Sequence, residues 1–294
     1  MRQSTPNDHA TQERMRRELL QKSDLVPPLP EFVVRLLALL NKPETEPQDL
    51  EFNMQNDQVL VAKMLAMVNS PFYGLNRTVR TIKDAVMVLG FRGVRSLVLA
   101  TSTAKYLQRD FTCYGHDQRG LWIHAVCVAS AARALARATR MGIDASEQLF
   151  VAGLLHDIGK LLLSSYVTDA IRQRGVIAGS TIEIERQLVG IDHTEAGALV
   201  TAKWNLSTEE QDVIKAHHDG HAPGGGRAAA VVRVADAVAH GRGLGYLPGR
   251  APDDHVEPHD LQALGIADAG VWGAVQNELI ATMDGAVAAL ARLS

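Results

Sequence analysis

The 294-residue sequence has few cysteines, few aromatic residues and no excess of positive charge. Its two cysteines, Cys113 and Cys127, exclude a disulfide framework and lack the spacing of a metal-binding cysteine pair. Such sparse cysteine usage fits a reducing compartment. Aromatic residues make up 5% of the chain, so we expect a core of Leu, Val and Ala. A formal net charge of -3 argues against a nucleic-acid partner, because nucleic-acid binders are usually basic.

Long hydrophobic runs are also lacking. No stretch of about 18 consecutive apolar residues occurs, and the N-terminus has no apolar segment of the kind found in signal peptides. We therefore expect a cytoplasmic protein with no membrane association. What the sequence does contain is a hydrophobic fraction of 46%, rich in the helix formers Leu and Ala.

Short helical patterns follow one another along most of the chain. Residues 1–24 are polar with charges of both signs, which predicts an N-terminal extension. Residues 25–118 alternate between apolar helical patterns and turn-forming residues, which predicts an N-terminal helical lobe. Residues 119–294 carry further helical patterns, which predict a second lobe with C-terminal helices. The predicted fold is therefore an all-α, two-lobed helical bundle with a metal site in its second lobe.

Several of the predicted helix starts are marked by capping residues. Ser180 and Ser207 are each followed three residues later by a glutamate, which is the spacing of a capping box. Asp192 is predicted to cap the next helix, and Thr45 to cap an earlier one. Gly90 is predicted to separate two helices in the N-terminal lobe.

The most unusual stretch is Leu154–Lys160, which places charged side chains between apolar runs. Burying charge is costly unless the charge is paired or bound to metal. If His156, Asp157 and Lys160 are buried, we therefore expect them to be paired or to bind a metal. We interpret the stretch as part of one helix, with Lys160 on the same face as Asp157. His156 and Asp157 could then converge on cations, and Lys160 could contact a bound phosphate. A buried His–Asp hydrogen bond beside a snorkelling lysine remains open for this stretch alone.

Seven candidate metal ligands are spread over about five predicted helices. They are His124, His156, Asp157, His193, His217, His218 and Asp236. Imidazole suits transition metals such as Zn, Fe and Ni, and carboxylate suits Mn and Mg. Ligands that project inward from facing helices suit a dinuclear centre, in which two ions could activate water and hold a phosphate.

Each candidate also has a structural interpretation when it is taken alone. A single histidine can be a core residue or a helix end, and Asp236 can form an ion pair with nearby Arg233. Arg92 and Arg95, beside Gly93, could bind an anion, but we interpret them as a solvated helix start. The remaining histidines are expected at the surface: His9, His116, His221, His240, His255 and His259.

Most of the chain resembles the HDOD family. The resemblance is carried by Leu25-x-Pro27-x-Leu29-Pro30, Asn56-Asp57, Leu65-x-x-x-Asn69-Ser70-Pro71-Phe72-Tyr73-Gly74, Ile82, Ala85 and Leu89-Gly90. It covers about residues 25–222. It implies a bacterial signalling output domain that is related to the HD superfamily of metal-dependent phosphohydrolases.

The order of the candidate ligands resembles that superfamily as well. His124, His156-Asp157 and Asp236 match its H…HD…D pattern. His193 and His217-His218 match the extended set of the HD-GYP phosphodiesterases, which act on cyclic dinucleotides, and Lys160 matches their phosphate-contacting lysine. The resemblance thus implies catalytic roles for Asp157 and Lys160.

Two departures from HD-GYP limit what the resemblance implies. No Gly-Tyr-Pro signature follows His218, which counts against cleavage of cyclic dinucleotides. Gly120 lies where some relatives with a third metal have a glutamate, which counts against a trinuclear site.

Two functions follow from this sequence. The first is a regulatory HDOD protein with a protein partner and a centre of two divalent transition-metal ions, with Fe, Mn, Ni and Zn not distinguished. The second is a metal-dependent phosphohydrolase or phosphodiesterase that acts on a nucleotide-type phosphoester.

Overall fold

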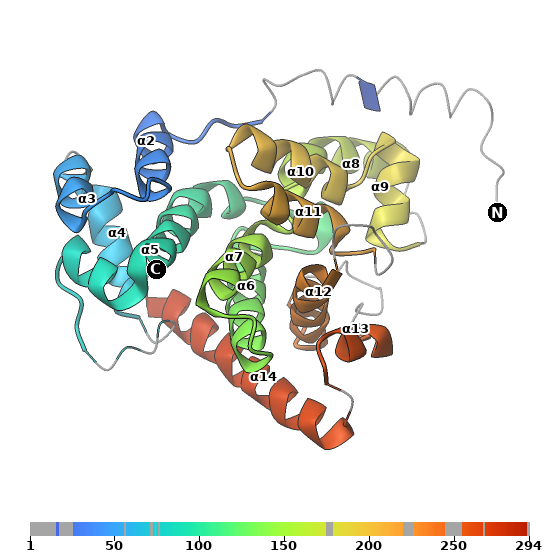
Figure 1. Cartoon of the computed structure of the whole chain (residues 1–294). Coiled ribbons are helices and arrows are strands. Elements are labelled where there is room, and N and C mark those ends of the chain that lie inside the picture. The colour runs from blue at the N-terminus through green and yellow to red at the C-terminus, as the bar shows by residue number, and fades with distance from the viewer. Residues whose placement is uncertain are drawn as a thin grey trace.

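The computed structural model describes residues 16–17, 26–55, 57–70, 73, 75, 77–174, 179–219, 226–244, 255–266 and 268–292. Over these residues the chain is a two-lobed helical bundle without strands, as predicted (Figure 1). The predicted N-terminal extension lies outside the described residues except for residues 16 and 17. The exact boundary between the two lobes stays a prediction.

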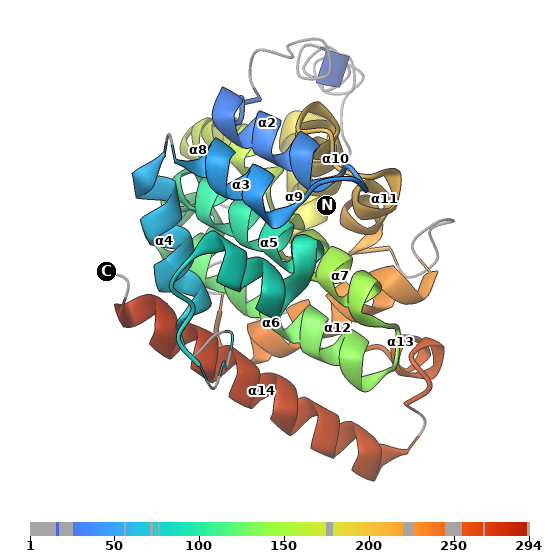
Figure 2. The ribbon, with the colours of Figure 1, turned by 60° about the vertical axis from the view of Figure 1, so that its left-hand side comes forward.

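The first helices of the chain pack around one long helix. They are α2 (Glu31–Leu40), α3 (Pro47–Met54) and α4 (Gln58–Val68), and each contacts α5 (Ile82–Leu107). Figure 2 shows α5 between these helices and the rest of the bundle. The cap of α3 is Glu46 rather than the predicted Thr45, whose hydroxyl instead donates to the Leu39 carbonyl at 2.6 Å.

The predicted break at Gly90 is a kink inside α5. Gly90 has φ 70° and ψ 174°, a backbone conformation that glycine adopts without the steric penalty of a side chain. The helix resumes after this residue and continues to Leu107. The sequence therefore located the irregular residue correctly, but the two predicted helices form one bent element.

The remaining helices form the rest of the bundle. They are η2 (Thr112–Tyr114), α6 (Gly120–Ala138), α7 (Ile143–Leu155), α8 (Lys160–Arg174), α9 (Thr181–Val189), α10 (His193–Lys203), α11 (Thr208–Ala216), α12 (Gly226–Gly241), α13 (Pro258–Ala263) and α14 (Ala269–Arg292). Small residues let α6 and α7 approach closely, since a Cβ on Gly153 would lie 3.0 Å from the Ala129 Cα. The helices α7, α12 and α14 all contact α6.

The caps predicted for three of these helices are present. Ser180 and Ser207 each form a complete capping box with the glutamate three residues later. The Asp192 carboxylate accepts hydrogen bonds from the amides of Thr194 and Glu195 at 2.9 and 3.1 Å. This cap fixes the first turn of α10, which contains His193.

Side chains from α5 and from the end of α10 tie the first helices to the rest of the bundle. Arg95 makes two hydrogen bonds, of 2.7 and 2.8 Å, to the buried carboxylate of Glu210, so it is not the solvated residue that we predicted. The Tyr106 hydroxyl donates to the Pro28 carbonyl at 2.6 Å, and the Trp204 ring nitrogen donates to the Pro27 carbonyl at 2.9 Å. The proline-rich segment is thus bound to helices of both lobes.

Three segments are long and apolar enough to cross a membrane by length and composition: Ile82–Leu107, Gly120–Ala138 and Ile143–Gln173. Their most apolar windows contain at most two charged residues, so they escaped a search for uninterrupted apolar runs. In the folded chain 61%, 78% and 78% of these windows is buried. Packing within the bundle therefore accounts for most of their apolar surface, and the absence of membrane association stays a prediction.

Candidate metal centre

The segment from His156 to Gly159 is a turn and not the continuous helix that we predicted. The helix α7 ends at Leu155, and α8 begins at Lys160. The turn still brings Lys160 to Asp157, because the ammonium donates to Asp157 Oδ2 at 2.6 Å. Both side chains are buried, so this ion pair lies inside the bundle.

Glycine is required at position 159 because the first turn of α10 packs directly against it. A Cβ on Gly159 would lie 2.0 Å from the carbonyl oxygen of His193 and 2.6 Å from the amide nitrogen of Gly197. Real side chains do not approach backbone atoms so closely. The missing side chain therefore lets the turn and α10 come together and places His193 beside Asp157.

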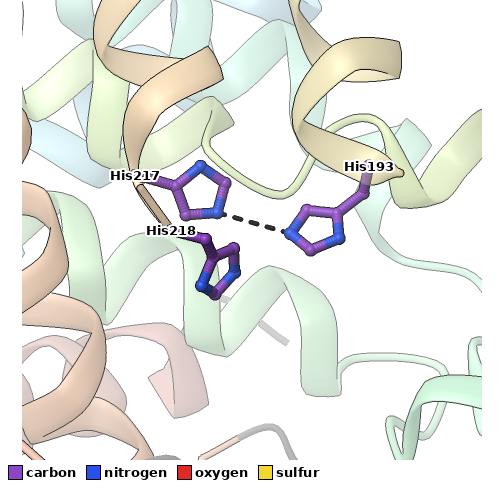
Figure 3. Close-up of side chains that lie close together, drawn as sticks. All are labelled: His193, His217 and His218. Carbon is purple, nitrogen blue, oxygen red and sulfur yellow. Dashed lines mark hydrogen bonds between the residues drawn. The ribbon is translucent and has the colours of Figure 1, made fainter. Parts of the chain in front are cut away.

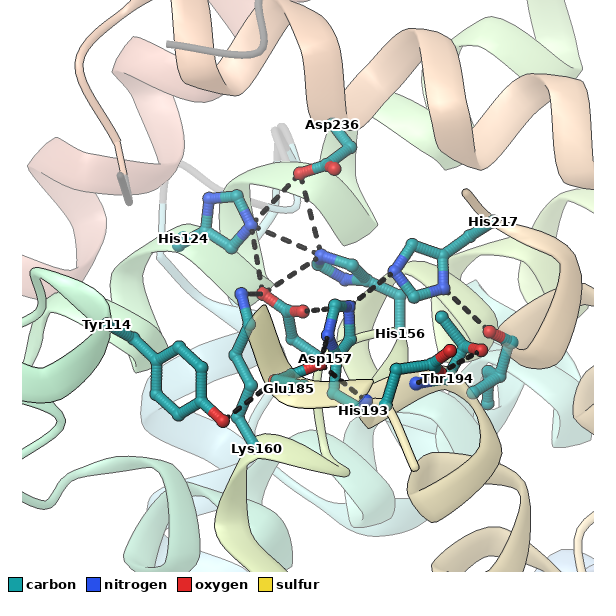
Figure 4. Close-up of polar contacts among 12 residues, drawn as sticks. Tyr114, His124, His156, Asp157, Lys160, Glu185, His193, Thr194, His217 and Asp236 are labelled. Carbon is teal, nitrogen blue, oxygen red and sulfur yellow. Dashed lines mark hydrogen bonds and ion pairs between the residues drawn. The ribbon is translucent and has the colours of Figure 1, made fainter. Parts of the chain in front are cut away.

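Four side chains from three parts of the chain converge at one point, which we name site A (Figure 4). His124 comes from α6, His156 and Asp157 from the turn, and Asp236 from α12. His124 Nε2 lies 3.2 Å from His156 Nε2, 3.6 Å from Asp157 Oδ2 and 3.1 Å from Asp236 Oδ1. His156 Nε2 lies 3.4 and 3.5 Å from the same two oxygens. Ligands bound about 2.0–2.2 Å from a tetrahedral ion are separated by roughly 3.3–3.6 Å, so this spacing suits a cation.

A second group of side chains, which we name site B, lies on the other side of Asp157. It consists of Asp157, His193, His217 and His218, and Figure 3 shows its three imidazoles. His193 Nε2 is 3.3 Å from Asp157 Oδ1 and 3.4 Å from His217 Nε2. His218 is exposed, so site B has a side chain in contact with solvent. The two oxygens of Asp157 thus face different sites.

Four of the imidazoles share one hydrogen-bond arrangement. In each of them Nδ1 faces an oxygen acceptor and Nε2 faces the interior of the site. The Nδ1 acceptors are Leu244 O for His124, Gly153 O for His156, Glu185 Oε2 for His193 and Ile214 O for His217, at 2.6 to 2.9 Å. Carbonyl and carboxylate oxygens cannot donate, so Nδ1 carries the proton, and a neutral ring then presents its Nε2 lone pair. This arrangement is typical of histidines that bind metal.

The charges of site A are strongly coupled in the metal-free protein. Burial lowers the pKa of His156, but Asp157 and Asp236 outweigh burial and raise this pKa to about 10. Burial raises the pKa of Asp157, and the positive charges of Lys160 and His156 more than offset that effect and hold it well below its usual value. Without a metal, a proton on His156 therefore occupies the position between the two carboxylates.

Two other imidazoles are held in the neutral form. Burial lowers the pKa of His124, although Asp236 acts in the opposite direction. Burial, together with the neighbouring His218, holds the pKa of His217 well below its usual value. Because a metal ligand must be deprotonated, these two rings are ready to bind a cation at neutral pH.

Asp236 does not form the ion pair with Arg233 that we had considered. Arg233 donates instead to both carboxylate oxygens of Asp260, at 3.0 and 3.1 Å through its Nε. Asp236 is therefore free to face His124 and His156. The Oδ1 atoms of Asp157 and Asp236 are both buried and accept no hydrogen bond from any described residue. Two such oxygens facing imidazole nitrogens are what a cation site requires.

Glu185 belongs to the site although no sequence motif indicated it. Its fully buried carboxylate accepts hydrogen bonds from the amide and Nδ1 of His193 at 2.8 and 2.7 Å. Its other oxygen accepts from the Tyr114 hydroxyl at 2.7 Å. Glu185 therefore orients the His193 ring. The available signal was a carboxylate on the apolar face of α9, next to buried Ile184 and Leu188.

Two histidines that we predicted at the surface are buried beside site A. His116 is 2% exposed and His240 is 9% exposed. His240 stacks on His124, with ring centroids 5.2 Å apart. His255 and His259 are largely exposed, as predicted, whereas His9 and His221 lie outside the described residues. The sequence therefore underestimated how many imidazoles surround the centre.

Comparisons with known proteins agree with the arrangement of the helices. An HDOD domain protein of unknown function from Geobacter sulfurreducens has 24% sequence identity and a TM-score of 0.73, with 95% of this chain and 98% of that chain covered. A protein from Shewanella amazonensis SB2B, provisionally named a phosphohydrolase, has 25% identity and a TM-score of 0.69, with 91% and 96% covered.

An uncharacterized protein of Treponema pallidum (strain Nichols) is 26% identical over 210 residues. The match covers 70% of this chain but 40% of the curated relative, so it spans less than half of that protein's length. The family model of the HDOD domain matches residues 26–220, close to the range that the sequence motifs predicted. The chain therefore belongs to the HDOD domain family.

Proposed function

We propose that this HDOD protein is a regulatory signalling protein whose second lobe holds two divalent transition-metal ions, one in site A and one in site B. Asp157 would bridge the two ions through its two carboxylate oxygens. One observation carries the proposal: three imidazoles whose Nδ1 atoms are hydrogen-bonded to acceptors, those of His124, His156 and His193, direct their Nε2 atoms at the two oxygens of one buried carboxylate, that of Asp157. Borderline ions such as Zn, Fe, Mn or Ni suit this mixture of imidazole and carboxylate.

The surface of the first lobe supports a role in binding a protein partner. Several large apolar side chains on α2–α5 are exposed, namely Val34, Phe52, Val59 and Met87. Phe52 is the most exposed of these side chains, at 72%, and a partner that covered it would remove its aromatic ring from water. We therefore propose that these helices contact another protein in a signalling pathway. A location in the cytoplasm is part of the same proposal.

A second candidate is a metal-dependent phosphohydrolase or phosphodiesterase that acts on a nucleotide-type phosphoester. It is favoured by Lys160, whose ammonium lies beside the bridging carboxylate. When bound, the two ions would supply positive charge that lowers the pKa of a bound water and binds phosphate oxygens. A cation that engages Asp157 Oδ2 would compete with the Lys160 ammonium, which could then bind a substrate oxygen. The relative from Shewanella amazonensis, at 25% identity, supports this candidate by its provisional name.

One experiment tests the metal centre and separates the two functions. Crystals of the metal-loaded protein should give anomalous difference peaks in site A and in site B. The same preparation is then assayed on a broad panel of phosphoesters with and without added Mn²⁺, next to His193→Ala as the site B variant. Metal peaks without turnover support the regulatory function, whereas turnover that His193→Ala abolishes supports the phosphohydrolase. The absence of both peaks would refute the metal centre.

A further inference from the structure

The short helix η2 lies in the loop that joins α5 to α6, and its last residue reaches the candidate metal centre. Tyr114 is 3% exposed, and its hydroxyl donates to Glu185 Oε1 at 2.7 Å (Figure 4). Glu185 Oε2 in turn accepts hydrogen bonds from the amide and Nδ1 of His193, at 2.8 and 2.7 Å. A continuous chain of hydrogen bonds therefore runs from Tyr114 through Glu185 to a candidate ligand of site B.

The backbone around Tyr114 is closed into a tight loop. Phe111 and His116 form an isolated antiparallel bridge, and the amide of His116 donates to the Phe111 carbonyl at 3.2 Å. The amide of Tyr114 donates to the same carbonyl at 2.7 Å. Gly115 has φ 78°, which lets the chain reverse its direction between Tyr114 and His116. Because Phe111 is buried as well, Tyr114 projects from an anchored loop.

The hydroxyl of Tyr114 is a fixed donor in the interior. Burial, together with the negative charge of Glu185, holds the pKa of Tyr114 well above its usual value, so the hydroxyl keeps its proton. The Glu185 carboxylate is fully buried, so bulk water cannot supply a replacement donor. Without this hydroxyl, Glu185 Oε1 would lose its hydrogen-bond partner in the core, which is unfavourable, and the carboxylate could rotate.

The ring of Tyr114 faces a second charged group. The Lys160 ammonium lies 5.4 Å from the ring centroid, within the range of a cation–π contact. Burial lowers the pKa of Lys160, but Asp157 and then Glu185 outweigh burial and raise it, so the ammonium stays charged. A Glu185 carboxylate released from Tyr114 would therefore be attracted to a neighbouring cation.

We propose that Tyr114 is a positioning residue of the metal centre: its hydroxyl fixes Glu185 and thereby holds the His193 ring in the orientation that site B requires. This role rests on the proposed function, because His193 must be a ligand of an ion in site B. It goes beyond the role of Glu185, since a carboxylate bound only to His193 could turn toward Lys160. Among the described residues, no hydrogen bond joins Tyr114 or Glu185 to a ligand of site A, so the effect is confined to site B.

A conservative substitution isolates the hydroxyl. Tyr114→Phe removes it and keeps the ring beside Lys160. Tyr106→Phe is the matched control, because Tyr106 is also buried and its hydroxyl donates to the Pro28 carbonyl at 2.6 Å. Cobalt(II) is titrated into the metal-free wild type and both variants, and anomalous peak heights at limiting cobalt assign each binding step to site A or site B. We expect Tyr114→Phe to weaken site B by about 10-fold, and site A and the control to keep wild-type affinity.

Two further measurements distinguish positioning from a general loss of stability. If Tyr114 acts through Glu185, the double variant Tyr114→Phe/Glu185→Gln should bind cobalt in site B as weakly as Glu185→Gln alone, so that the two effects are not additive. In the metal-free protein, the NMR signal of the His193 Nδ1 proton should shift or broaden in Tyr114→Phe. The same signal should keep its wild-type position in Tyr106→Phe.

The outcomes separate the role of Tyr114 from the proposed function. A wild-type protein that binds no cobalt in site B would refute the proposed centre, and the role of Tyr114 with it. If the wild type binds cobalt there, unchanged site B affinity in Tyr114→Phe, or additive losses in the double variant, would refute the role of Tyr114 alone. Circular dichroism checks that each variant is folded. If Tyr114→Phe does not fold, incorporation of fluorotyrosine makes the hydroxyl a stronger donor, and an unchanged His193 Nδ1 proton signal would then refute the role.

Discussion

Replacement of Asp157 by asparagine gives the most informative test of the centre. The Asp157 carboxylate accepts a 2.6 Å hydrogen bond from Lys160 and faces both site A and site B. Asp157 and Lys160 are 2% and 6% exposed, so water cannot solvate the Lys160 ammonium when the carboxylate charge is lost. Asparagine keeps the size of the side chain and removes its negative charge. We therefore expect Asp157→Asn to lose the ions of sites A and B and to destabilise the metal-free fold.

The size of the stability change follows from the burial of the pair. Removing one partner of a buried ion pair costs about 3–5 kcal/mol, because the remaining charge is left in the interior without compensation. Whole proteins are stable by about 5–15 kcal/mol, so this change is a large fraction of the total. Replacing the second partner as well is often close to neutral. The double variant Asp157→Asn/Lys160→Met should therefore recover most of the lost stability while still lacking both ions.

The assay separates the structural effect from the effect on metal binding. Denaturant midpoints are measured in the presence of a chelator for the wild type, both single variants and the double variant. Metal content is measured on the same four proteins without chelator. A metal-free Asp157→Asn protein as stable as the metal-free wild type would refute the buried-pair argument. Retention of an ion in either site A or site B would refute the shared role of Asp157.

Three other predictions follow from the described contacts. Glu185→Gln should weaken metal binding in site B by about 10–100-fold, because Glu185 orients His193, and chelator competition should detect this change. Unchanged affinity would contradict that role. Arg95→Met should lower the free energy of unfolding by about 3 kcal/mol, since it leaves the buried Glu210 carboxylate uncompensated, and a denaturant shift near zero would argue against this. Loading of site A at pH 7 should release about one proton, because burial lowers the pKa of His156 but Asp157 and Asp236 raise it to about 10. Metal affinity should then increase between pH 7 and about 10, and calorimetry in buffers with different ionisation heats should show the release. Affinity that is independent of pH would contradict this.

The sequence predicted the features of the fold that depend on local interactions. Ser180, Asp192 and Ser207 were identified as caps because a side-chain oxygen two or three residues before a free amide acts within one turn. Gly90 was recognised as irregular, but a single residue cannot reveal whether the helix resumes beyond it. That outcome depends on packing of the segment after Gly90 against α6 and α7, which no local pattern records.

The candidate centre was predicted less completely than the fold. The seven candidate ligands could be identified from the sequence, because His and Asp residues in this order on apolar helices are a recognisable pattern. In the structure they all lie together. The turn at Gly159 was missed, since its cause is the close approach of α10, more than 30 residues farther along the chain. Glu185 and His116 were missed for a similar reason. Each reaches the centre through tertiary packing, and neither lies in a motif with a characteristic spacing.

The close approach at Gly159 has a consequence for the spacing of the two proposed metal sites. His193 belongs to α10, and its own carbonyl oxygen occupies the volume that a methyl group at position 159 would need. Any larger residue there would move α10 outward and carry the His193 ring away from Asp157, while the ligands of site A stayed in place. In the proposed centre, the missing side chain at position 159 would therefore set the distance between the two ions, and we expect an alanine at this position to leave site A able to bind an ion and site B unable to.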